Sequence, residues 1–281
     1  MHPGKFEYHK AGSIDEAVSL GGGDASFLAG GHSLIPAMKL RLSEPSSLVD
    51  ISGIDELKGI SRDGDTVKIG ALTTHSEVAS SDVVKDGCAA LAEAAGMIGD
   101  PQVRNRGTIG GNVAHADPAS DYPGILVALG ATIVTNSQSV AAEDFFTGLF
   151  ETALGEGEIV TEVQVPTMGS ASGAAYAKFY NPASRYAVVG VGVVVTKSGD
   201  SCESCRIGVT GASDHAYRAT AAEEALTGSD HGDGAIAAAA AKIADGTEMM
   251  SDLSASAEYR AHLCGGMGKR SIAEAASRAC C

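Results

Sequence analysis

The chain contains the segment LAGGHSLIPAMKL at residues 28–40 and the segment GTIGGNVAHADPASDYP at residues 107–123. In each, a Gly-Gly pair ends an apolar stretch and is followed at once by small polar residues. Glycine has no side chain, so a ligand can approach the backbone closely at such a turn. Two turns of this kind predict one elongated, phosphate-bearing ligand that is held from two sides.

The two turns, AGGHS at 29–33 and TIGGN at 108–112, are expected to present consecutive backbone N–H groups together with a hydroxyl or an amide. Oriented N–H groups are the donors that a pyrophosphate needs. One such turn alone is also typical of an ordinary tight turn; the pair, with the polar stretch HADPASD at 115–121, favours a ligand site. A nicotinamide Rossmann site is rejected, because GVGVVV at 190–195 lies inside an apolar strand and opens no helix.

Working outward from the first turn, residues 13–51 are expected to form helix, glycine-rich turn, strand, helix and strand. Ser13 is a candidate N-cap with Glu16 three residues later, and Pro36 is tolerated in the first turn of the second helix. Residues 65–79 read as strand, turn and helix, and a further helix is expected from about Asp86 to Ile98. The second Gly-Gly segment is expected to be a loop, and residues 158–166 alternate as a strand does.

The small, flexible stretch TMGSASGAA at 167–175 marks the expected domain boundary. We therefore expect an α+β chain with one domain at 1–170, divided into subdomains at about 1–55 and 56–170, and a second domain at 174–281. The second domain is expected to be a three-stranded antiparallel sheet packed on helices. Its strands are predicted at 175–180, 187–195 and 204–211, and its helices at 220–228, 235–246 and 256–279.

The chain has 281 residues and a net charge of −15, with 35 acidic and 20 basic residues. That sign argues against a nucleic-acid partner. The profile fits a protein from a high-salt cytoplasm or an ordinary acidic protein. The overall field repels phosphate but is screened within about 8 Å at physiological salt, so short-range backbone N–H donors would have to dominate. With no apolar run of about 18 residues and no signal peptide, we expect a cytoplasmic protein without a membrane span.

The cysteine and histidine patterns do not predict a metal site. Cys202 and Cys205 form a CxxC pair, but no second pair and no nearby histidine completes a four-ligand set. We interpret this pair as part of a surface hairpin turn. His75 and His115 are interpreted as loop residues that form hydrogen bonds, because no HxxxH or His/Cys cluster surrounds them.

The whole chain resembles the FAD-binding medium subunits of the molybdenum hydroxylases, a family that includes medium subunits of carbon monoxide dehydrogenases and FAD-binding subunits of xanthine dehydrogenases. The resemblance rests, in order, on AGGHSLIPAMKLRL, LVDI, IGALTTH, DPQVRNRGTIGGNVAHADPASDYP and EYR at 258–260. It implies a two-part FAD-binding domain of the vanillyl-alcohol-oxidase/PCMH type, followed by a C-terminal domain of the carbon monoxide dehydrogenase flavoprotein type.

The resemblance also implies which residues contact FAD. The first turn would hold the pyrophosphate from one side and the second turn from the other. Asp121 matches an aspartate that contacts the flavin nucleotide, Lys178 a lysine near the flavin ring, and Tyr186 a tyrosine over the isoalloxazine. The full set of implied cofactor-binding residues is Ala29, Gly30, Gly31, His32, Ser33, Ile98, Thr108, Ile109, Gly110, Gly111, Asn112, Asp121, Val160, Lys178 and Tyr186.

Two positions depart from the family or from its relatives. Arg185 stands where the family usually has aspartate before the tyrosine, and a positive charge there would favour reduced, anionic flavin. His32 matches a position that carries covalent flavin in distant relatives of the fold. In this family the equivalent histidine is unlinked, so the resemblance implies non-covalent FAD.

The implied function is electron transfer. Electrons from a molybdenum centre in a large molybdopterin-binding subunit would pass through the [2Fe-2S] clusters of a small subunit to FAD, and then to a quinone or NAD. The subunits would assemble as a dimer of heterotrimers, most similar to those of aerobic carbon monoxide oxidation. Xanthine, aldehyde and aromatic-acid dehydrogenases remain open as alternatives, as do an FAD-storing or assembly protein and a stand-alone FAD oxidoreductase.

Overall fold

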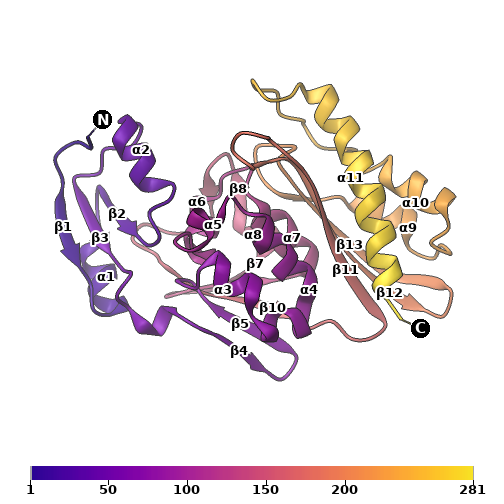
Figure 1. Cartoon of the computed structure of the whole chain (residues 1–281), viewed down its shortest axis with the longest axis horizontal. Coiled ribbons are helices and arrows are strands. Elements are labelled where there is room, and N and C mark those ends of the chain that lie inside the picture. The colour runs from indigo at the N-terminus through magenta and orange to yellow at the C-terminus, as the bar shows by residue number, and fades with distance from the viewer. Residues whose placement is uncertain (1, 281) are drawn as a thin grey trace.

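In the computed structural model, which describes residues 2–280, the chain forms three parts that lie in a row (Figure 1). The N-terminal part has a parallel sheet in the order β1-β3-β2. The sequence did not predict its edge strand β1. The elements are β1 (Glu7–Lys10), α1 (Ile14–Leu20), β2 (Ala25–Leu28), α2 (Leu34–Leu40) and β3 (Ser47–Asp50), followed by a 3-10 turn at Asp55–Leu57.

The cap predicted for the first helix forms. The Ser13 hydroxyl accepts a hydrogen bond from the Glu16 N–H, and the Glu16 carboxylate accepts one from the Gly12 N–H at 2.8 Å. The Glu16 N–H, one of those that a helix start leaves without a partner, is thereby satisfied, and the Glu16 carboxylate also holds the residue before the cap. The helix therefore begins where the sequence predicts.

The central part is built on a five-stranded antiparallel sheet in the order β4-β5-β10-β6-β7. Strand β10 comes last in the sequence and pairs in the middle, which ties the end of this part to its beginning. The strands are β4 (Ile60–Asp63), β5 (Thr66–Gly70), β6 (Thr132–Thr135), β7 (Ser139–Ala141) and β10 (Val160–Pro166), with a separate hairpin of β8 (Phe146–Gly148) and β9 (Glu151–Thr152).

The helices of the central part follow the apolar pattern, with two differences from the sequence-based expectation. The segment expected as a loop contains a helix, because Thr108 caps it and its side chain accepts a hydrogen bond from the Gly111 N–H. The next difference is that the long helix begins at Asp82 and is broken at Cys88. The helices are α3 (His75–Ser80), α4 (Asp82–Met97), α5 (Pro101–Arg104), α6 (Ile109–His115), α7 (Asp121–Leu129) and α8 (Ala142–Phe145).

The C-terminal part has four strands instead of the three expected, in the order β11-β12-β13-β14. The fourth strand has two residues, too few to give an alternating pattern that the sequence could reveal. The elements are β11 (Ser172–Tyr180), β12 (Ala187–Ser198), β13 (Ser201–Thr210), β14 (Tyr217–Arg218), α9 (Thr220–Leu226), α10 (Asp233–Ala240) and α11 (Ala257–Arg278).

The interpretation of the CxxC pair as a surface turn is wrong. Strand β13 begins before Cys202, so Cys202 and Cys205 lie within the strand, and both side chains are buried in the core of the C-terminal part. Burial raises the pKa of the Cys205 thiol. Within the described part of the chain, no group of three or more His, Cys, Asp or Glu side chains is arranged to hold a metal ion.

The C-terminal sheet is covered on one face by α11 and on the other by α7 of the central part (Figure 1). Glycine permits both contacts. A Cβ on Gly208 would lie 2.1 Å from the Gly124 carbonyl oxygen of α7, and one on Gly173 would lie 2.1 Å from the Ala275 carbonyl oxygen of α11. All nine residues of α7 are buried. This helix therefore belongs to the core of the central part and also carries the C-terminal sheet.

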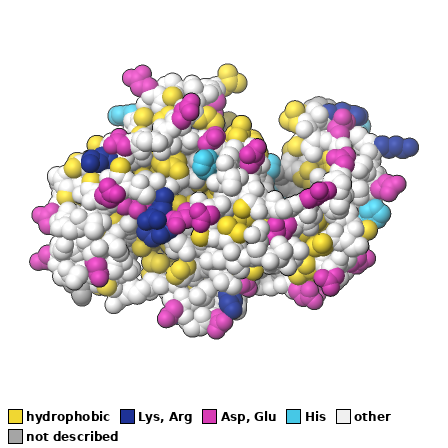
Figure 2. Space-filling view, turned by 180° about the vertical axis from the view of Figure 1, so that it is seen from behind, with side chains coloured by type: hydrophobic (Ala, Val, Ile, Leu, Met, Phe, Trp, Pro, Cys, Tyr) yellow, Lys and Arg dark blue, Asp and Glu magenta, His cyan; other side chains and the backbone are white. Residues whose placement is uncertain are grey.

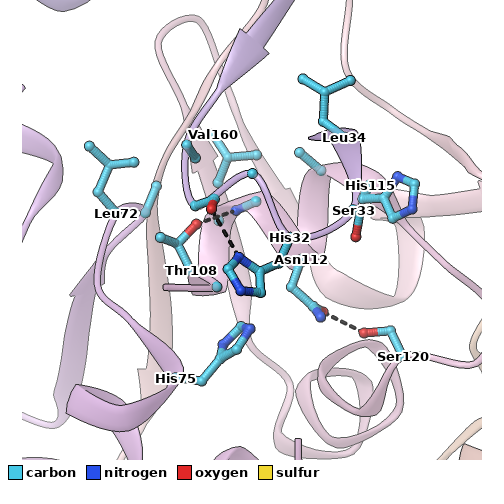
Figure 3. Close-up of a pocket in the computed structure, with 18 of the residues that line it drawn as sticks. His32, Ser33, Leu34, Leu72, His75, Thr108, Asn112, His115, Ser120 and Val160 are labelled. Carbon is cyan, nitrogen blue, oxygen red and sulfur yellow. Dashed lines mark hydrogen bonds between the residues drawn. The ribbon is translucent and has the colours of Figure 1, made fainter. Parts of the chain in front are cut away.

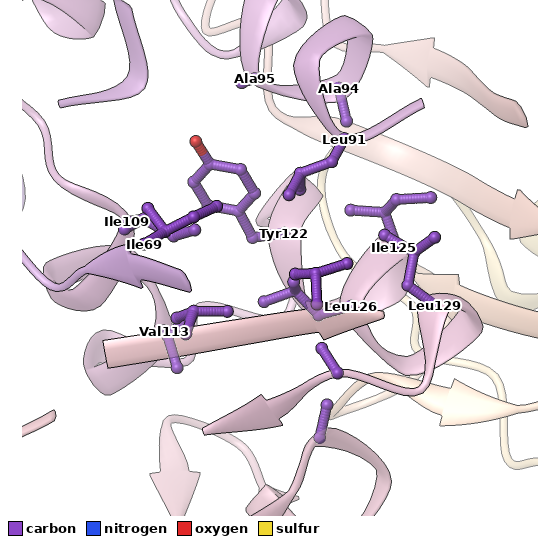
Figure 4. Close-up of a cluster of buried hydrophobic side chains, with 14 of the residues drawn as sticks. Ile69, Leu91, Ala94, Ala95, Ile109, Val113, Tyr122, Ile125, Leu126 and Leu129 are labelled. Atoms are coloured by element: carbon purple, nitrogen blue, oxygen red, sulfur yellow. The ribbon is translucent and has the colours of Figure 1, made fainter. Parts of the chain in front are cut away.

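The core of the central part lies around α7, α4 and the sheet (Figure 4). Ile69, Leu91, Ile109, Ile125 and Leu126 are fully buried there, and the Tyr122 ring packs among them. Its hydroxyl points out of the apolar cluster. Among residues 2–280, no helix has both the length and the apolarity required to cross a membrane.

The close contact of α7 with the sheet predicts that Gly208→Ala lowers the free energy of unfolding by about 1–3 kcal/mol, because the added methyl group must push the Gly124 backbone away. Urea denaturation measures the change. The matched control is Gly266→Ala in α11, where a Cβ would meet nothing within 4 Å. That variant should be up to about 1 kcal/mol more stable than the original chain. Equal stability of the two variants would contradict this packing argument.

Candidate functional site

The first Gly-Gly turn connects the end of β2 to the start of α2. Gly31 has a φ of +73°, a left-handed conformation that glycine adopts without strain. The Ile35 N–H donates to the Gly31 carbonyl at 3.1 Å. It is the first N–H group after Gly30 that donates to an acceptor in the protein. Within residues 2–280, the four preceding N–H groups, those of residues 31–34, donate to no protein acceptor. This turn therefore offers a run of free backbone donors.

The second Gly-Gly turn differs from the expectation in this respect. Its N–H groups are already used inside the protein: Ile109 donates to the Thr73 carbonyl at 3.0 Å, and Gly110 donates to the Ala71 carbonyl at 2.8 Å. The Gly111 N–H donates to the Thr108 hydroxyl at 3.1 Å. The expectation that both turns present a run of free amides is corrected: the N–H groups of residues 109–112 are bonded inside the protein, so only the first turn offers consecutive free donors.

The glycines of both turns are required by close approach between segments of the protein. A Cβ on Gly30 would lie 2.0 Å from the Arg106 carbonyl oxygen, and one on Gly110 would lie 2.4 Å from the Ala71 Cβ. On Gly111 it would lie 3.7 Å from the Ala29 Cβ, so the two turns face each other. Gly30 thus lets the N-terminal and central parts meet with no side chain between them, and Gly110 lets α6 pack closely against the end of β5 within the central part.

A cavity of about 480 Å³ lies where the two turns meet. The N-terminal and central parts form two of its walls, and residues 184–186 of the loop between β11 and β12 form a third. Figure 3 shows part of the lining, and Figure 2, seen from behind, shows acidic side chains spread over that face of the molecule. The predicted residues that line it are Ala29, Gly30, Gly31, His32, Ser33, Ile98, Thr108, Gly110, Gly111, Asn112, Asp121, Val160 and Tyr186.

Two predicted residues, Ile109 and Lys178, do not line this cavity. Ile109 is fully buried, because the first turn of α6 directs its side chain into the central core. Lys178 lies behind the cavity wall, where its ammonium is 2.8 Å from the Asp121 carboxylate and 3.3 Å from the Met97 carbonyl oxygen. It therefore acts on the cavity through Asp121.

Asp121 lies at the N-terminus of α7 and is 4% exposed. Its carboxylate accepts hydrogen bonds from Lys178 and from the Tyr176 hydroxyl, each at 2.8 Å. Burial raises the pKa of Asp121, while the Lys178 ammonium and the Tyr176 hydrogen bond oppose that rise. Residues of α7 and β11 are thereby joined by a charged pair that borders the cavity.

The loop at residues 181–186 carries Tyr186 to the cavity. Asn181 organises this loop, since its side chain accepts from the Ala183 and Ser184 N–H groups. Arg185 has a φ of +63°, which is uncommon for a residue other than glycine. Its guanidinium carbon lies 5.7 Å from the centre of the Tyr180 ring, so the side chain extends from the loop toward Tyr180. Burial raises the pKa of Tyr186.

Three histidines line the cavity (Figure 3). His32 Nδ1 lies 3.1 Å from the Gly30 carbonyl oxygen, and His115 lies against Phe150 with ring centroids 5.2 Å apart. His75, expected on a loop, is the first residue of α3 and is 3% exposed. The Thr74 capping box, with Glu77 three residues later, was the sequence signal that places it there.

Sequence reasoning missed the wall formed by residues 154–159 and the cavity-lining residues Phe27, Ile51 and Leu72. Glu158 is held there by the hydroxyls of Thr135 and Ser137 and by the Gly155 N–H. These residues are separated in the sequence and carry no motif. The pairing of β10 with β5 and β6 brings the strand that follows Glu158 to the cavity, whereas Phe27 and Ile51 reach it from the paired strands β2 and β3 of the N-terminal part.

Residues 4–168 match the FAD binding domain in molybdopterin dehydrogenase, and residues 174–275 match the CO dehydrogenase flavoprotein C-terminal domain. The carbon monoxide dehydrogenase medium chain of Hydrogenophaga pseudoflava is 41% identical, and the match covers 99% of both chains. The structure of carbon monoxide dehydrogenase from that organism superimposes with a TM-score of 0.96 at 42% identity, with 100% of both chains covered. Quinoline 2-oxidoreductase from Pseudomonas putida 86 gives 0.93 at 31% identity over 99% of both chains. The chain therefore belongs to the family of FAD-binding medium subunits of molybdopterin dehydrogenases.

Proposed function

We propose that the chain is the flavoprotein subunit of a molybdenum hydroxylase that oxidises carbon monoxide. Bound FAD would supply the redox chemistry, taking electrons from the [2Fe-2S] clusters of a partner subunit and passing them to an external acceptor. The observation that carries the proposal is the run of four free N–H groups beside a cavity in a chain related over its full length to carbon monoxide dehydrogenase medium chains. The runner-up is a medium subunit of a xanthine, aldehyde or aromatic-acid dehydrogenase, and quinoline 2-oxidoreductase supports the aromatic class.

The residues of the cavity fit FAD. The donors of residues 31–34 suit a diphosphate, because neutral amides bind anions without adding charge. The apolar side chains of Leu72, Ile98 and Val160 suit flat rings. We assign the N-terminal region, residues 1–170, to an FAD-binding domain of the PCMH type and residues 174–281 to the C-terminal domain.

In this proposal each wall has a different task. The first turn binds the diphosphate, and the second turn holds the first in place. The Asp121–Lys178 pair closes the cavity beside α7, where the Asp121 carboxyl group accepts a hydrogen bond from the Lys178 ammonium 2.8 Å away. Tyr186 covers the ring, and Arg185 adds a positive charge to the same wall.

The partners in this proposal are a large molybdopterin-binding subunit and a small [2Fe-2S] subunit, assembled as a dimer of heterotrimers in the cytoplasm. Molybdopterin and the clusters belong to those partners. A substrate of the complete enzyme would react at the molybdenum centre, so this chain determines the path of the electrons and the partners determine the substrate.

Filling the cavity should prevent flavin binding. Ala114 lies on the exposed side of α6 and lines the cavity. Ala114→Phe should weaken FAD binding at least about tenfold, or about 1.4 kcal/mol, because the ring occupies ligand space without disturbing the core. Ala238→Phe on exposed α10 is the matched control and should leave the ratio of flavin to protein in the purified complex unchanged. A normal flavin content in Ala114→Phe would contradict the location of the site.

FAD held only by hydrogen bonds and packing should leave the protein when the fold is lost. Acid precipitation of the flavin-loaded protein should therefore release all of the flavin into the supernatant. Absorbance of the supernatant and of the redissolved pellet measures the division. Flavin retained in the pellet would mean a covalent bond, and His32→Ala would then identify or exclude His32 as its site.

The chain alone should oxidise neither carbon monoxide nor purines, aldehydes or quinoline with a dye as acceptor, because it would lack the centre at which these substrates react. Assembly with the two partner subunits should restore oxidation of carbon monoxide and give a complex in equal proportions. Rapid oxidation by the chain alone would support a stand-alone flavoenzyme instead. Restored oxidation of a different substrate would select the runner-up.

A further inference from the structure

His75 is a buried histidine that the proposed function does not yet use. It lies at the start of α3, lines the cavity and is 3% exposed. A Cβ on Gly107 would lie 2.6 Å from its Nε2 atom, so this edge of the ring touches the backbone that leads into the second turn. The other edge faces Tyr122, whose hydroxyl oxygen lies 3.3 Å from Nδ1. The two ring nitrogens therefore face different surroundings.

Tyr122 determines which of the two nitrogens carries the hydrogen. Its side chain is fully buried, and within the described part of the chain His75 Nδ1 is the one hydrogen-bond partner of its hydroxyl. A buried hydroxyl that donates to nothing is costly. The hydroxyl therefore donates to Nδ1, which must hold a lone pair, and the hydrogen of the neutral ring is left on Nε2.

The surroundings also keep this ring neutral. Burial, together with the smaller effects of the charges of His32 and Arg104, lowers the pKa of His75 to about 4. No carboxylate acts on the ring to oppose these effects. At neutral pH the residue is therefore an uncharged donor through Nε2 in the wall of the cavity.

In the His32 ring the hydrogen is on the other nitrogen, Nδ1. Its Nδ1 atom faces the Gly30 carbonyl oxygen, which can only accept, so Nδ1 carries a hydrogen. His32 comes from the first turn and His75 from the segment against the second, and the two are close enough for the charge of one to act on the other (Figure 3). In the described chain, His75 Nε2 has no protein acceptor within hydrogen-bond distance, although His75 lines the same cavity as the first turn.

We propose that His75, oriented by Tyr122, is a neutral hydrogen-bond donor to the anionic diphosphate portion of the bound dinucleotide. This inference rests on the proposed FAD site and adds a residue to it. The first turn supplies backbone N–H groups from one side, and His75 supplies a side-chain N–H from the other. The N–H groups of residues 109–112 in the second turn are bonded inside the protein, so His75 adds a donor on that side of the cavity.

Two substitutions separate the roles of the two nitrogens. The side-chain amide of glutamine reaches the place of Nε2, whereas that of asparagine reaches only the place of Nδ1. His75→Gln should therefore keep FAD affinity within about threefold of the original protein. His75→Asn should lose about tenfold to hundredfold, the range for a hydrogen bond to a charged group. Fluorescence titration of the full chain, alone and assembled with its partners, measures both. His262→Gln on the exposed surface of α11 is the control and should change nothing.

Riboflavin, which lacks the diphosphate, gives an independent test. Its affinity should be the same in His75→Gln and His75→Asn, because the donor concerns the diphosphate alone. Urea denaturation of both variants checks that neither result reflects a lost fold. Equal FAD affinity in the two folded variants, or an equal loss of riboflavin and FAD in His75→Asn, would overturn the proposal.

The tautomer can be observed without any ligand. The ¹⁵N spectrum of the histidine-labelled chain distinguishes a protonated from an unprotonated ring nitrogen, and for His75 it should show hydrogen on Nε2 between pH 5 and 8. Tyr122→Phe should remove this preference and weaken FAD binding by about threefold to tenfold. Hydrogen on Nδ1 in the original chain would refute the inference even if FAD binds. Failure of the original assembled protein to bind FAD would instead refute the proposed function.

Discussion

The cavity exists because two backbone segments touch with no side chain between them. Gly30 lies against the Arg106 carbonyl, and Gly110 lies against Ala71. A methyl group on Gly30 would separate the N-terminal part from the central part, and one on Gly110 would push α6 away from the end of β5 within the central part. The contact fixes the first turn at the entrance of α2, and the four N–H groups of that turn remain available because the chain curves away from every protein acceptor within residues 2–280. The free N–H groups, the cavity and the contact between the two parts thus all depend on the close approach of Gly30 to the Arg106 carbonyl.

Helix α7 connects this arrangement to the rest of the molecule. Its first residue, Asp121, pairs with Lys178 of β11, and its second, Tyr122, orients His75 at the start of α3. Glycines on the C-terminal sheet let this helix pack at backbone distance. The position of one buried helix therefore determines the charge pair on one cavity wall and the tautomer of a histidine on another.

The positions of the motifs and of most helices could be predicted from the sequence. Which backbone N–H groups are bonded inside the protein could not. The Ser13 cap and the long C-terminal helix are local signals and were predicted correctly, whereas the second Gly-Gly segment, expected as a loop, is a helix. Whether the amides of residues 109–111 are free depends on Ala71 and Thr73, which no local pattern connects to them. Lys178 matched a family position, yet its distance to Asp121 comes from tertiary packing. The CxxC pair was misplaced because a turn at 199–200 and one at 202–205 look alike in sequence.

The shared position of α7 also bears on how the molecule folds. The side chains of this helix lie in the same core as Ala174, Tyr176 and Ala216 of the C-terminal part. The segment near residue 170 links the two parts in the sequence, but it does not divide the chain into two units that are stable independently of each other. The sheet of the C-terminal part would expose an apolar face if the central part were unfolded, and the central part would expose α7 if that sheet were lost. The two parts should thus gain and lose their structure cooperatively, as a single unit whose folding waits for contacts between residues far apart in the sequence.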